Sequence, residues 1–205
     1  MRKKWSLFLA GIAWVAVLTQ YFLMVENRVA SVGETTIRFF SFFTILTNSL
    51  VAIYFTWWIF LYKKENPSIL NKPGTLTALT VYITIVGLVY QILLRPIWEP
   101  TGIQLVVDEL LHSVIPLVVI VCWYLFEDKS LVSYRQIPQW LIYPLIYLAY
   151  ILIRGNGSGF YPYPFVDVGS LGLSKVLINA MGLMVLFVGI SALYIKVGKS
   201  VRRNQ

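Results

Sequence analysis

Residues 105–126 read LVVDELLHSVIPLVVIVCWYLF, an apolar stretch that is interrupted near its beginning by Asp108, Glu109 and His112. About 20 residues of helix cross the hydrocarbon core of a bilayer, so this stretch predicts a membrane-spanning helix. Ionisable side chains cost free energy in hydrocarbon, and within a span they mark a functional site by default. His112 is the only histidine of the chain. The same stretch therefore indicates both the fold class and the region of a candidate site.

The rest of the chain has the composition of a polytopic membrane protein. Of its 205 residues 58% are hydrophobic and only 13% are charged. The segments that are long and apolar enough to span are 5–24, 39–62, 75–94, 105–126, 137–153 and 171–195. They predict one all-α domain over residues 1–205, a six-helix bundle, because backbone groups in lipid must form their hydrogen bonds within helices. Pro144 predicts a kink in the fifth segment, with the freed carbonyl satisfied by a neighbouring helix.

The distribution of basic residues predicts the orientation of the bundle. Of the 17 lysines and arginines, twelve lie on the side that holds both termini and the second and fourth loops. The positive-inside rule then places both termini in the cytoplasm of a multi-pass cell-membrane protein. The net charge of +8 follows from this bias and from attraction to anionic headgroups, and it does not indicate a nucleic-acid partner. The sequence leaves open whether the chain forms a homo-oligomer.

Polar residues form a stripe on each of two predicted spans. Ser41, Thr44 and Asn48 follow helical spacing on the second span, and Asp108 and His112 are one turn apart on the fourth. Both spans run in the same direction. Counted from their predicted outer ends, Thr44 and His112 lie about 8 and 10 Å inside the bundle, at 1.5 Å per residue. The two side chains are therefore predicted to meet in one buried site.

The chemistry available to such a pair is nucleophilic. A threonine hydroxyl is inert until a base takes its proton, and neutral histidine is the usual base near pH 7. Asp108 is a candidate to orient the imidazole, and the Asn48 amide is a candidate donor to a developing oxyanion. The alternative for Thr44 is a hydrogen bond to its own helix, and the alternative for Asn48 is to join two helices.

Further polar residues gather at the predicted outer ends of the helices. Arg95 and Arg154 are candidates to bind an anionic head of a lipid substrate, and Gln91 extends this polar lining one turn inward. Ordinary snorkelling to the interface is the alternative for both arginines. Glu109 is a candidate to face one of them. The segment 154–172, rich in Gly, Pro and Tyr, is predicted to pack as a lid over the outer mouth of the bundle.

Four motifs carry a resemblance over nearly the whole chain: FFTILTNSLVA at 42–52, RPIWEPTG at 95–102, DELLHSVIP at 108–116 and RGNGSGFYPYPFVD at 154–167. In these the chain resembles the bacterial six-helix relatives of the androgen-induced protein family, which includes the androgen-dependent TFPI-regulating protein. The resemblance implies an integral membrane threonine hydrolase that cleaves fatty acid esters of hydroxy fatty acids. The family threonine matches Thr44 rather than Thr47, and the family histidine matches His112.

Other classes of function share some of these features. Asp108, Glu109 and His112 would also suit a proton-coupled transporter or a lipid-binding scaffold. The same three residues could instead be the ligands of a metal ion. One histidine and one cysteine, Cys122, cannot build a zinc cluster or two axial haem ligands, so no cofactor is expected. The glycine-rich GNGSG sequence at 155–159 resembles a rhomboid serine motif, but its glycine spacing and the order of serine and histidine differ. Hydrolysis of a membrane lipid ester is the leading hypothesis.

Overall fold

The computed structural model describes residues 1–61 and 68–203, and every regular element in these ranges is a helix. Six helical segments are long and apolar enough to cross a membrane. They comprise α1 (Arg2–Glu26), α3 (Phe43–Phe60), α4 (Thr75–Val89) with its continuation to Ile97, α5 (Gly102–Glu109) with α6 (Ile115–Phe126), α7 (Ile137–Trp140) with α8 (Ile142–Ser158), and α10 (Leu173–Arg203). The predicted all-α class and membrane architecture are confirmed.

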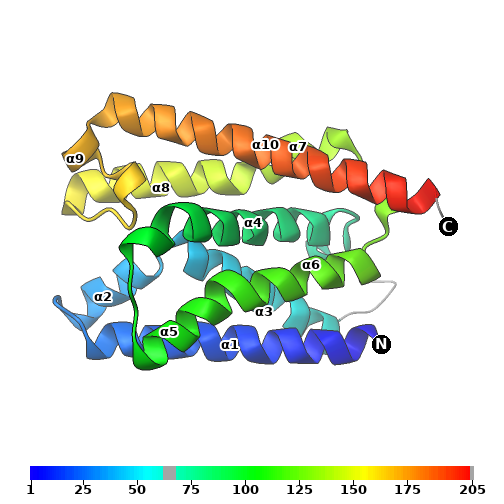
Figure 1. Ribbon diagram of the computed structural model, residues 1–205, viewed down its shortest axis with the longest axis horizontal. Coiled ribbons are helices and arrows are strands. Elements are labelled where there is room, and N and C mark those ends of the chain that lie inside the picture. Colours follow the sequence, from blue (N-terminus) through cyan, green and yellow to red (C-terminus); the bar gives the residue numbers. More distant parts are fainter. Residues whose placement is uncertain (62–67, 204–205) are drawn as a thin grey trace.

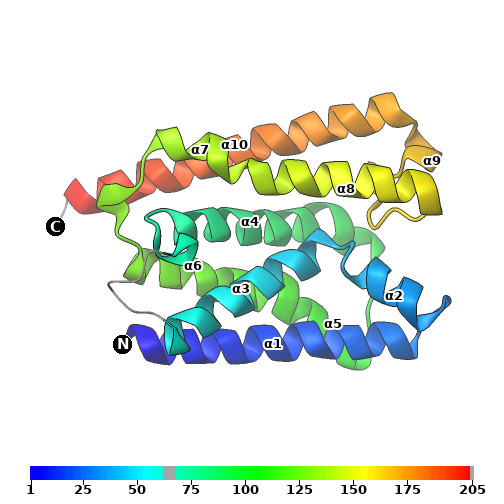
Figure 2. The same cartoon turned by 180° about the vertical axis from the view of Figure 1, so that it is seen from behind.

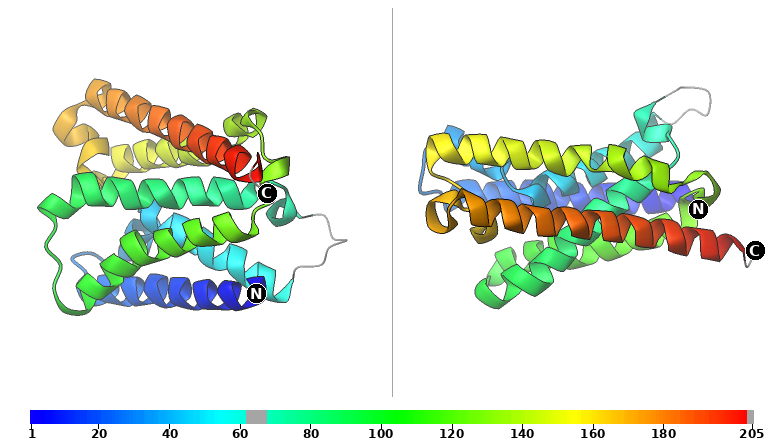
Figure 3. Two further views of the ribbon diagram at one scale, coloured as in Figure 1. Left: turned by 45° about the vertical axis from the view of Figure 1, so that its right-hand side comes forward. Right: turned by 90° about the horizontal axis from the view of Figure 1, so that it is seen from above.

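The bundle is arranged around α4. This helix has the largest buried share of the six and packs against α3, α6 and α10. Helices α8 and α10 lie on one side of α4, and α1, α3 and α6 lie on the other (Figures 1 and 2). Only 17% and 22% of the residues in the most apolar parts of the α7–α8 span and of α10 are buried within the bundle. These helices therefore present most of their apolar surface to lipid. Both termini lie at the same end of the bundle, as Figure 3 also shows.

The beginning of the second span differs from the prediction. A continuous helix was expected from residue 39, but the structure has a separate helix, α2 (Val32–Phe39), and α3 begins only at Phe43. Ser41 lies in the turn between them, so it does not share a helical face with Thr44 as predicted. The predicted end of this span at residue 62 lies outside the described residues, as do Lys63 and Lys64.

Side-chain hydrogen bonds replace helical ones in the turn at Ser41. The Ser41 hydroxyl donates to the carbonyl of Ile37 at 2.8 Å, and the Tyr147 hydroxyl of α8 donates to the carbonyl of Ser41 at 2.9 Å. These bonds satisfy backbone groups that a continuous helix would have paired. The hydropathy of the segment could not show this break, because FFSFF at 39–43 is equally apolar in a helix and in a turn. As a result Thr44 lies in the first turn of α3.

The fifth span breaks where Pro144 requires it. Proline has no N–H, so the carbonyl of Trp140, four residues earlier, receives no helical hydrogen bond, and the chain turns at Leu141 between α7 and α8. The Tyr82 hydroxyl of α4 donates to that carbonyl at 2.6 Å. The predicted kink, and the satisfaction of its carbonyl by a neighbouring helix, are confirmed.

The segment 154–172 is partly helical rather than wholly a loop. Helix α8 continues through Arg154 to Ser158, and a short α9 (Val168–Leu171) precedes α10. The chain between them folds back onto α8 at Gly155, where a Cβ atom would lie 2.0 Å from the Tyr161 ring. This close approach requires glycine. It holds the returning segment, including Tyr163, against the end of the bundle that is opposite the termini.

Glu34 joins α2 to α8 at this same end. Its Oε1 accepts from Arg38 Nε at 2.8 Å and from Arg154 Nη2 at 2.7 Å. The hydrogen bond from Arg38, together with the contact to Arg154, lowers the pKa of the Glu34 carboxyl. A lowered pKa in the folded state means that the carboxylate stabilises the fold above the ordinary carboxyl pKa, and that this stabilisation is lost as the pH falls through the lowered value.

Glu34→Gln is therefore expected to lower the thermal stability at pH 7 and to have a smaller effect at about pH 3, where more of the carboxyl is protonated. The measurement is the melting temperature of the detergent-solubilised protein at both pH values. Glu26→Gln is the matched control, since Glu26 is an exposed carboxylate at the end of α1 on the same side of the bundle. An equal loss of stability at both pH values would assign the effect of Glu34→Gln to shape rather than charge.

Candidate functional site: a threonine and a histidine between two helices

Thr44 and His112 meet in the structure. The hydroxyl Oγ1 of Thr44, in the first turn of α3, lies 3.3 Å from Nε2 of His112, and both residues are buried. His112 belongs to a π-helical turn, Leu110–Val114, between α5 and α6. The distance slightly exceeds the usual reach of a catalytic hydrogen bond, as is common before substrate binds. The structure thus brings the Thr44 and His112 side chains together in one buried site, as the sequence predicted.

The second ring nitrogen determines which tautomer of His112 is present. Nδ1 lies 3.0 Å from the backbone carbonyl oxygen of Asp108. A carbonyl only accepts hydrogen bonds, so in the neutral imidazole we assign the proton to Nδ1. Nε2 then carries a lone pair that faces the Thr44 hydroxyl. This is the arrangement in which histidine accepts a proton from an alcohol.

One neighbouring span, α4 with its continuation, fixes the position of the imidazole. The Tyr90 ring, in a second π-helical turn at Tyr90–Leu94, stacks on the His112 ring with centroids 3.9 Å apart and planes 10° apart. Gly87 in α4 allows the chain of the turn to approach closely, since a Cβ atom there would lie 3.1 Å from the His112 carbonyl oxygen. Single π-helical turns occur frequently at functional sites, and hydropathy does not reveal them.

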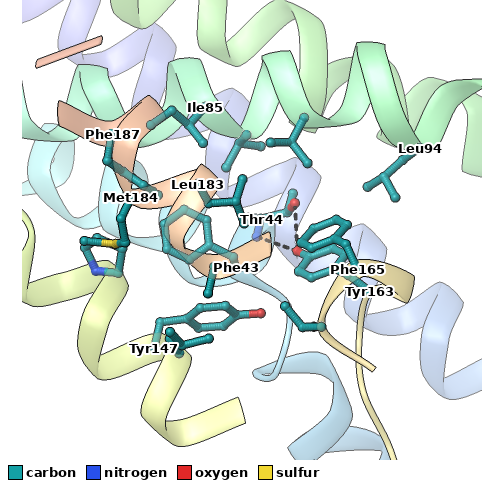
Figure 4. Close-up of a pocket in the computed structure, with 16 residues that line it drawn as sticks. Phe43, Thr44, Ile85, Leu94, Tyr147, Tyr163, Phe165, Leu183, Met184 and Phe187 are labelled. Carbon is teal, nitrogen blue, oxygen red and sulfur yellow. Dashed lines mark hydrogen bonds between the residues drawn. The ribbon is translucent and has the colours of Figure 1, made fainter. Parts of the chain in front are cut away.

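Tyr163 is a site residue that the sequence did not single out. Its hydroxyl lies 3.4 Å from Thr44 Oγ1 and accepts a hydrogen bond from the Thr44 backbone N–H at 3.3 Å (Figure 4). Burial raises the pKa of the Tyr163 phenol, so the group keeps its proton and can donate. The predicted lid segment supplies this residue, but nothing in the spacing of PYPF at 162–165 indicated which tyrosine would reach Thr44.

The two carboxylates beside His112 have separate surroundings. Oδ2 of Asp108 accepts from Trp98 Nε1 at 2.5 Å, and Oδ1 accepts from Gln104 Nε2 at 3.3 Å. Oδ1 is 3.9 Å from His112 Nδ1, so the carbonyl of Asp108, rather than its carboxylate, orients the imidazole. Glu109 turns away and pairs with Arg95 at 2.6 Å. That pairing is the predicted alternative for Glu109.

Asn48 joins two helices. Its Nδ2 donates to the carbonyl of Thr44 at 2.9 Å and to that of Leu111, in the π-helical turn, at 3.3 Å. Both hydrogens of the amide are thereby occupied. The expectation that Asn48 donates to an oxyanion is not supported by this geometry, because a third acceptor would have to displace one of these carbonyls. Asn48 instead holds α3 and the His112 turn at a fixed separation.

The predicted anion-binding residues lie outside the site. Arg95 donates to Gln91 Oε1 and Glu109 Oε1, and Arg154 donates to Glu34 Oε1 and to the carbonyl of Phe160. None of Arg95, Arg154 and Gln91 lines the cavity that contains Thr44 and His112. The expectation that they bind the substrate is not supported by this geometry, because each of the two guanidinium groups is already paired with a carboxylate of the protein.

Two cavities meet at Thr44. The larger, of about 490 Å³, contains Thr44, Tyr90, His112 and Tyr163 together with the polar residues Gln20, Asn27, Trp98, Gln104 and Asp108. The smaller, of about 80 Å³, lies between α3, α4, α8 and α10 and is almost wholly apolar (Figure 4). Thr44, Leu94 and Tyr163 line both. The Thr44 hydroxyl thus lies between two cavities that are both lined mainly by apolar side chains, and only the larger one also contains amide and carboxylate groups.

Within residues 1–61 and 68–203, no group of three or more His, Cys, Asp and Glu residues is placed to hold a metal ion. Asp108 and Glu109 point to different partners, as described above, so the three-ligand alternative finds no geometric support. Comparisons with protein-family models, curated proteins and solved structures found no match to this chain. The geometry of the site is therefore what indicates the function of this protein.

Proposed function

We propose that this protein is an integral membrane lipid-ester hydrolase with Thr44 as nucleophile and His112 as base. The observation that carries the proposal is the 3.3 Å contact between Thr44 Oγ1 and the unprotonated Nε2 of His112, in a buried site that opens to a cavity. A base within reach of a hydroxyl, itself oriented by a third group, is the arrangement that nucleophilic catalysis requires.

The reaction proceeds in two balanced halves. His112 Nε2 takes the Thr44 proton while Oγ1 attacks the ester carbonyl carbon, and the resulting tetrahedral intermediate expels the alcohol, which leaves with that proton. The acyl group is then bonded to Thr44. Water attacks this acyl-threonine with His112 again as base, and the carboxylic acid departs while the proton returns to Oγ1. The products are one acid and one alcohol.

Two features beside Thr44 suit a developing oxyanion. The Tyr163 hydroxyl lies 3.4 Å from Oγ1 and is a donor. Thr44 is also the second residue of α3, at the end of the helix where the dipole is positive, and its own N–H donates to the Tyr163 hydroxyl. Donors of this kind, held in a site without bulk water, stabilise negative charge more strongly than the same groups do in water.

A proton-coupled transporter is less well supported. A relay through Asp108, Glu109 and His112 requires their ionisable groups to be linked, but the Glu109 carboxylate accepts from Arg95 and Ser113 on the outer surface of the helix. The Asp108 carboxylate is held by Trp98 and Gln104. The histidine accordingly contacts a hydroxyl and a carbonyl rather than a chain of acids.

Tyr163→Phe is expected to lower kcat by about 10- to 100-fold with little change in KM, because loss of one oxyanion donor weakens binding of the transition state. The measurement is steady-state hydrolysis of a lipid ester in detergent micelles. Tyr161→Phe is the matched control, as this neighbouring tyrosine packs on Gly155. If kcat is unchanged in Tyr163→Phe, the tyrosine has only a packing role.

The proposal is tested by incubating the purified protein with lipid esters and with an activated alkyl phosphonate. Release of fatty acid, together with covalent labelling whose mass maps to the peptide that contains Thr44, would support it. Flux of a substrate into sealed vesicles that depends on a pH gradient, without release of acid, would support the transporter instead.

A further inference from the structure

The two cavities divide an ester bound at Thr44 into an acyl side and an alcohol side. The smaller cavity is lined by apolar side chains of α4 and α10, including Ile85, Leu183, Met184 and Phe187 (Figure 4). Apolar surface favours a hydrocarbon chain, and placing polar groups there without hydrogen-bond partners costs free energy. The first carbons of the acyl chain therefore fit the smaller cavity, and the alcohol part belongs in the larger one, where the amide and carboxylate groups lie.

The polar groups of the larger cavity are hydrogen-bonding groups with almost no formal charge. Gln20, Asn27 and Gln104 contribute amides, Trp98 contributes an indole N–H and Asp108 contributes a carboxylate. Gln104 already donates to Gln20 Oε1 at 2.8 Å, so two of the three amides are connected. Among the described residues that line this cavity there is no lysine or arginine.

Three of the four arginines at this end of the bundle are held elsewhere by acids, and the fourth, Arg28, donates to the carbonyl of Val25 and does not line the cavity. Arg95 pairs with Glu109, while Arg38 and Arg154 both pair with Glu34. A substrate carboxylate that entered the larger cavity would lose its hydration without gaining a cation, and it would approach the buried Asp108. A hydroxyl-bearing head would instead find amide and carboxylate partners.

We propose that the alcohol part of the substrate is uncharged and carries hydroxyl groups, as in a fatty acid monoester of glycerol. This inference rests on the proposed hydrolase function and specifies its substrate class. It departs from the free carboxylate of the hydroxy fatty acid esters that the family resemblance implies. The structural reason is that the polar groups of the cavity are mainly amides, that no lysine or arginine is among the described residues that line it, and that Arg38, Arg95 and Arg154 are already paired.

A pair of substrates that differ only in charge gives the sharpest test. The probes are a palmitoyl ester of hydroxystearic acid, with its carboxylate free, and the methyl ester of the same molecule, both hydrolysed by the full-length protein in neutral detergent. We expect kcat/KM to be at least about tenfold higher for the methyl ester, because an unpaired charge in a desolvated cavity opposes binding. Monopalmitoylglycerol is expected to be hydrolysed as efficiently as the methyl ester, or more so.

A variant tests the recognition of hydroxyl groups. Gln104→Leu is expected to raise KM for monopalmitoylglycerol about tenfold, and to raise KM for the methyl ester, which has no hydroxyl group for the amide to bind, by clearly less. Gln91→Leu is the matched control, since Gln91 lies at the same end of the bundle but outside the cavity. Melting temperatures of both variants would confirm that they are folded.

The possible results are distinct. Equal or faster hydrolysis of the free carboxylate would overturn the uncharged head and leave the hydrolase function intact. An equal rise of KM for both neutral esters in Gln104→Leu would also overturn it. If none of the three esters is hydrolysed and no phosphonate labels Thr44, the proposed function and this inference fall together.

Discussion

Thr44→Ala is expected to abolish ester hydrolysis, with kcat lower by about 10⁴-fold, and to remove labelling by an alkyl phosphonate. The hydroxyl is the only group of Thr44 that faces His112, and without it no acyl-enzyme can form. The substitution leaves the backbone of α3 unchanged and removes only contacts to the His112 and Tyr163 side chains. The measurement combines steady-state kinetics with mass spectrometry of the labelled peptide.

Thr47→Ala is the matched control for this loss. Thr47 lies one turn further along α3, is equally buried, and its hydroxyl contacts Tyr143 at 3.1 Å. This variant is expected to lose about 1 kcal/mol of stability through one hydrogen bond and to keep its turnover. Thr44→Ser should retain most of the activity, because it retains the hydroxyl. Undiminished turnover in Thr44→Ala would remove Thr44 from the mechanism.

The membrane architecture was accessible from the sequence because it depends on composition averaged over long windows. Six apolar segments of sufficient length predict six spans whatever their neighbours are, and the structure has them. The same holds for Pro144, whose missing N–H has a local consequence that needs no knowledge of the fold. The helical irregularities at Ser41 and within 110–114 depend instead on contacts that form only in the folded protein. The hydropathy of the sequence does not predict these irregularities.

The pair at the centre of the site was predictable for a related reason. Thr44 and His112 lie on two spans that run in the same direction, and counting residues from the predicted outer ends placed them together. The count itself was wrong for Thr44, because α3 begins only at Phe43 and the turn before it brings Thr44 to His112. Whether Arg95 faces a substrate or Glu109 depends on the rotation of two helices and on side-chain rotamers, which counting does not determine. Tyr163 reaches Thr44 by a chain reversal after α8, so its position is set by the packing of Tyr161 on Gly155.

His112→Ala is expected to lower kcat by about 10³-fold or more, and added imidazole is expected to restore part of that activity. The substitution removes the base but leaves Thr44, Tyr163 and the carbonyl of Asp108 in place. A small heterocycle can enter the space left by the imidazole ring, because that space adjoins a cavity of about 490 Å³. It can also stack on the Tyr90 ring, as the His112 ring does. The measurement is the rate of hydrolysis as a function of imidazole concentration.

Rescue by imidazole separates a chemical role of His112 from a structural one. A residue that only supports the packing of the π-helical turn would not have its loss repaired by a free base in solution. Ser113→Ala is the matched control in the same turn, since the Ser113 hydroxyl contacts Gln91 and Glu109 rather than the cavity. This control should hydrolyse esters at the rate of the unmodified protein and should not respond to imidazole. A His112→Ala protein with full activity would show that another group takes the proton from Thr44, and the assignment of the base would then be wrong.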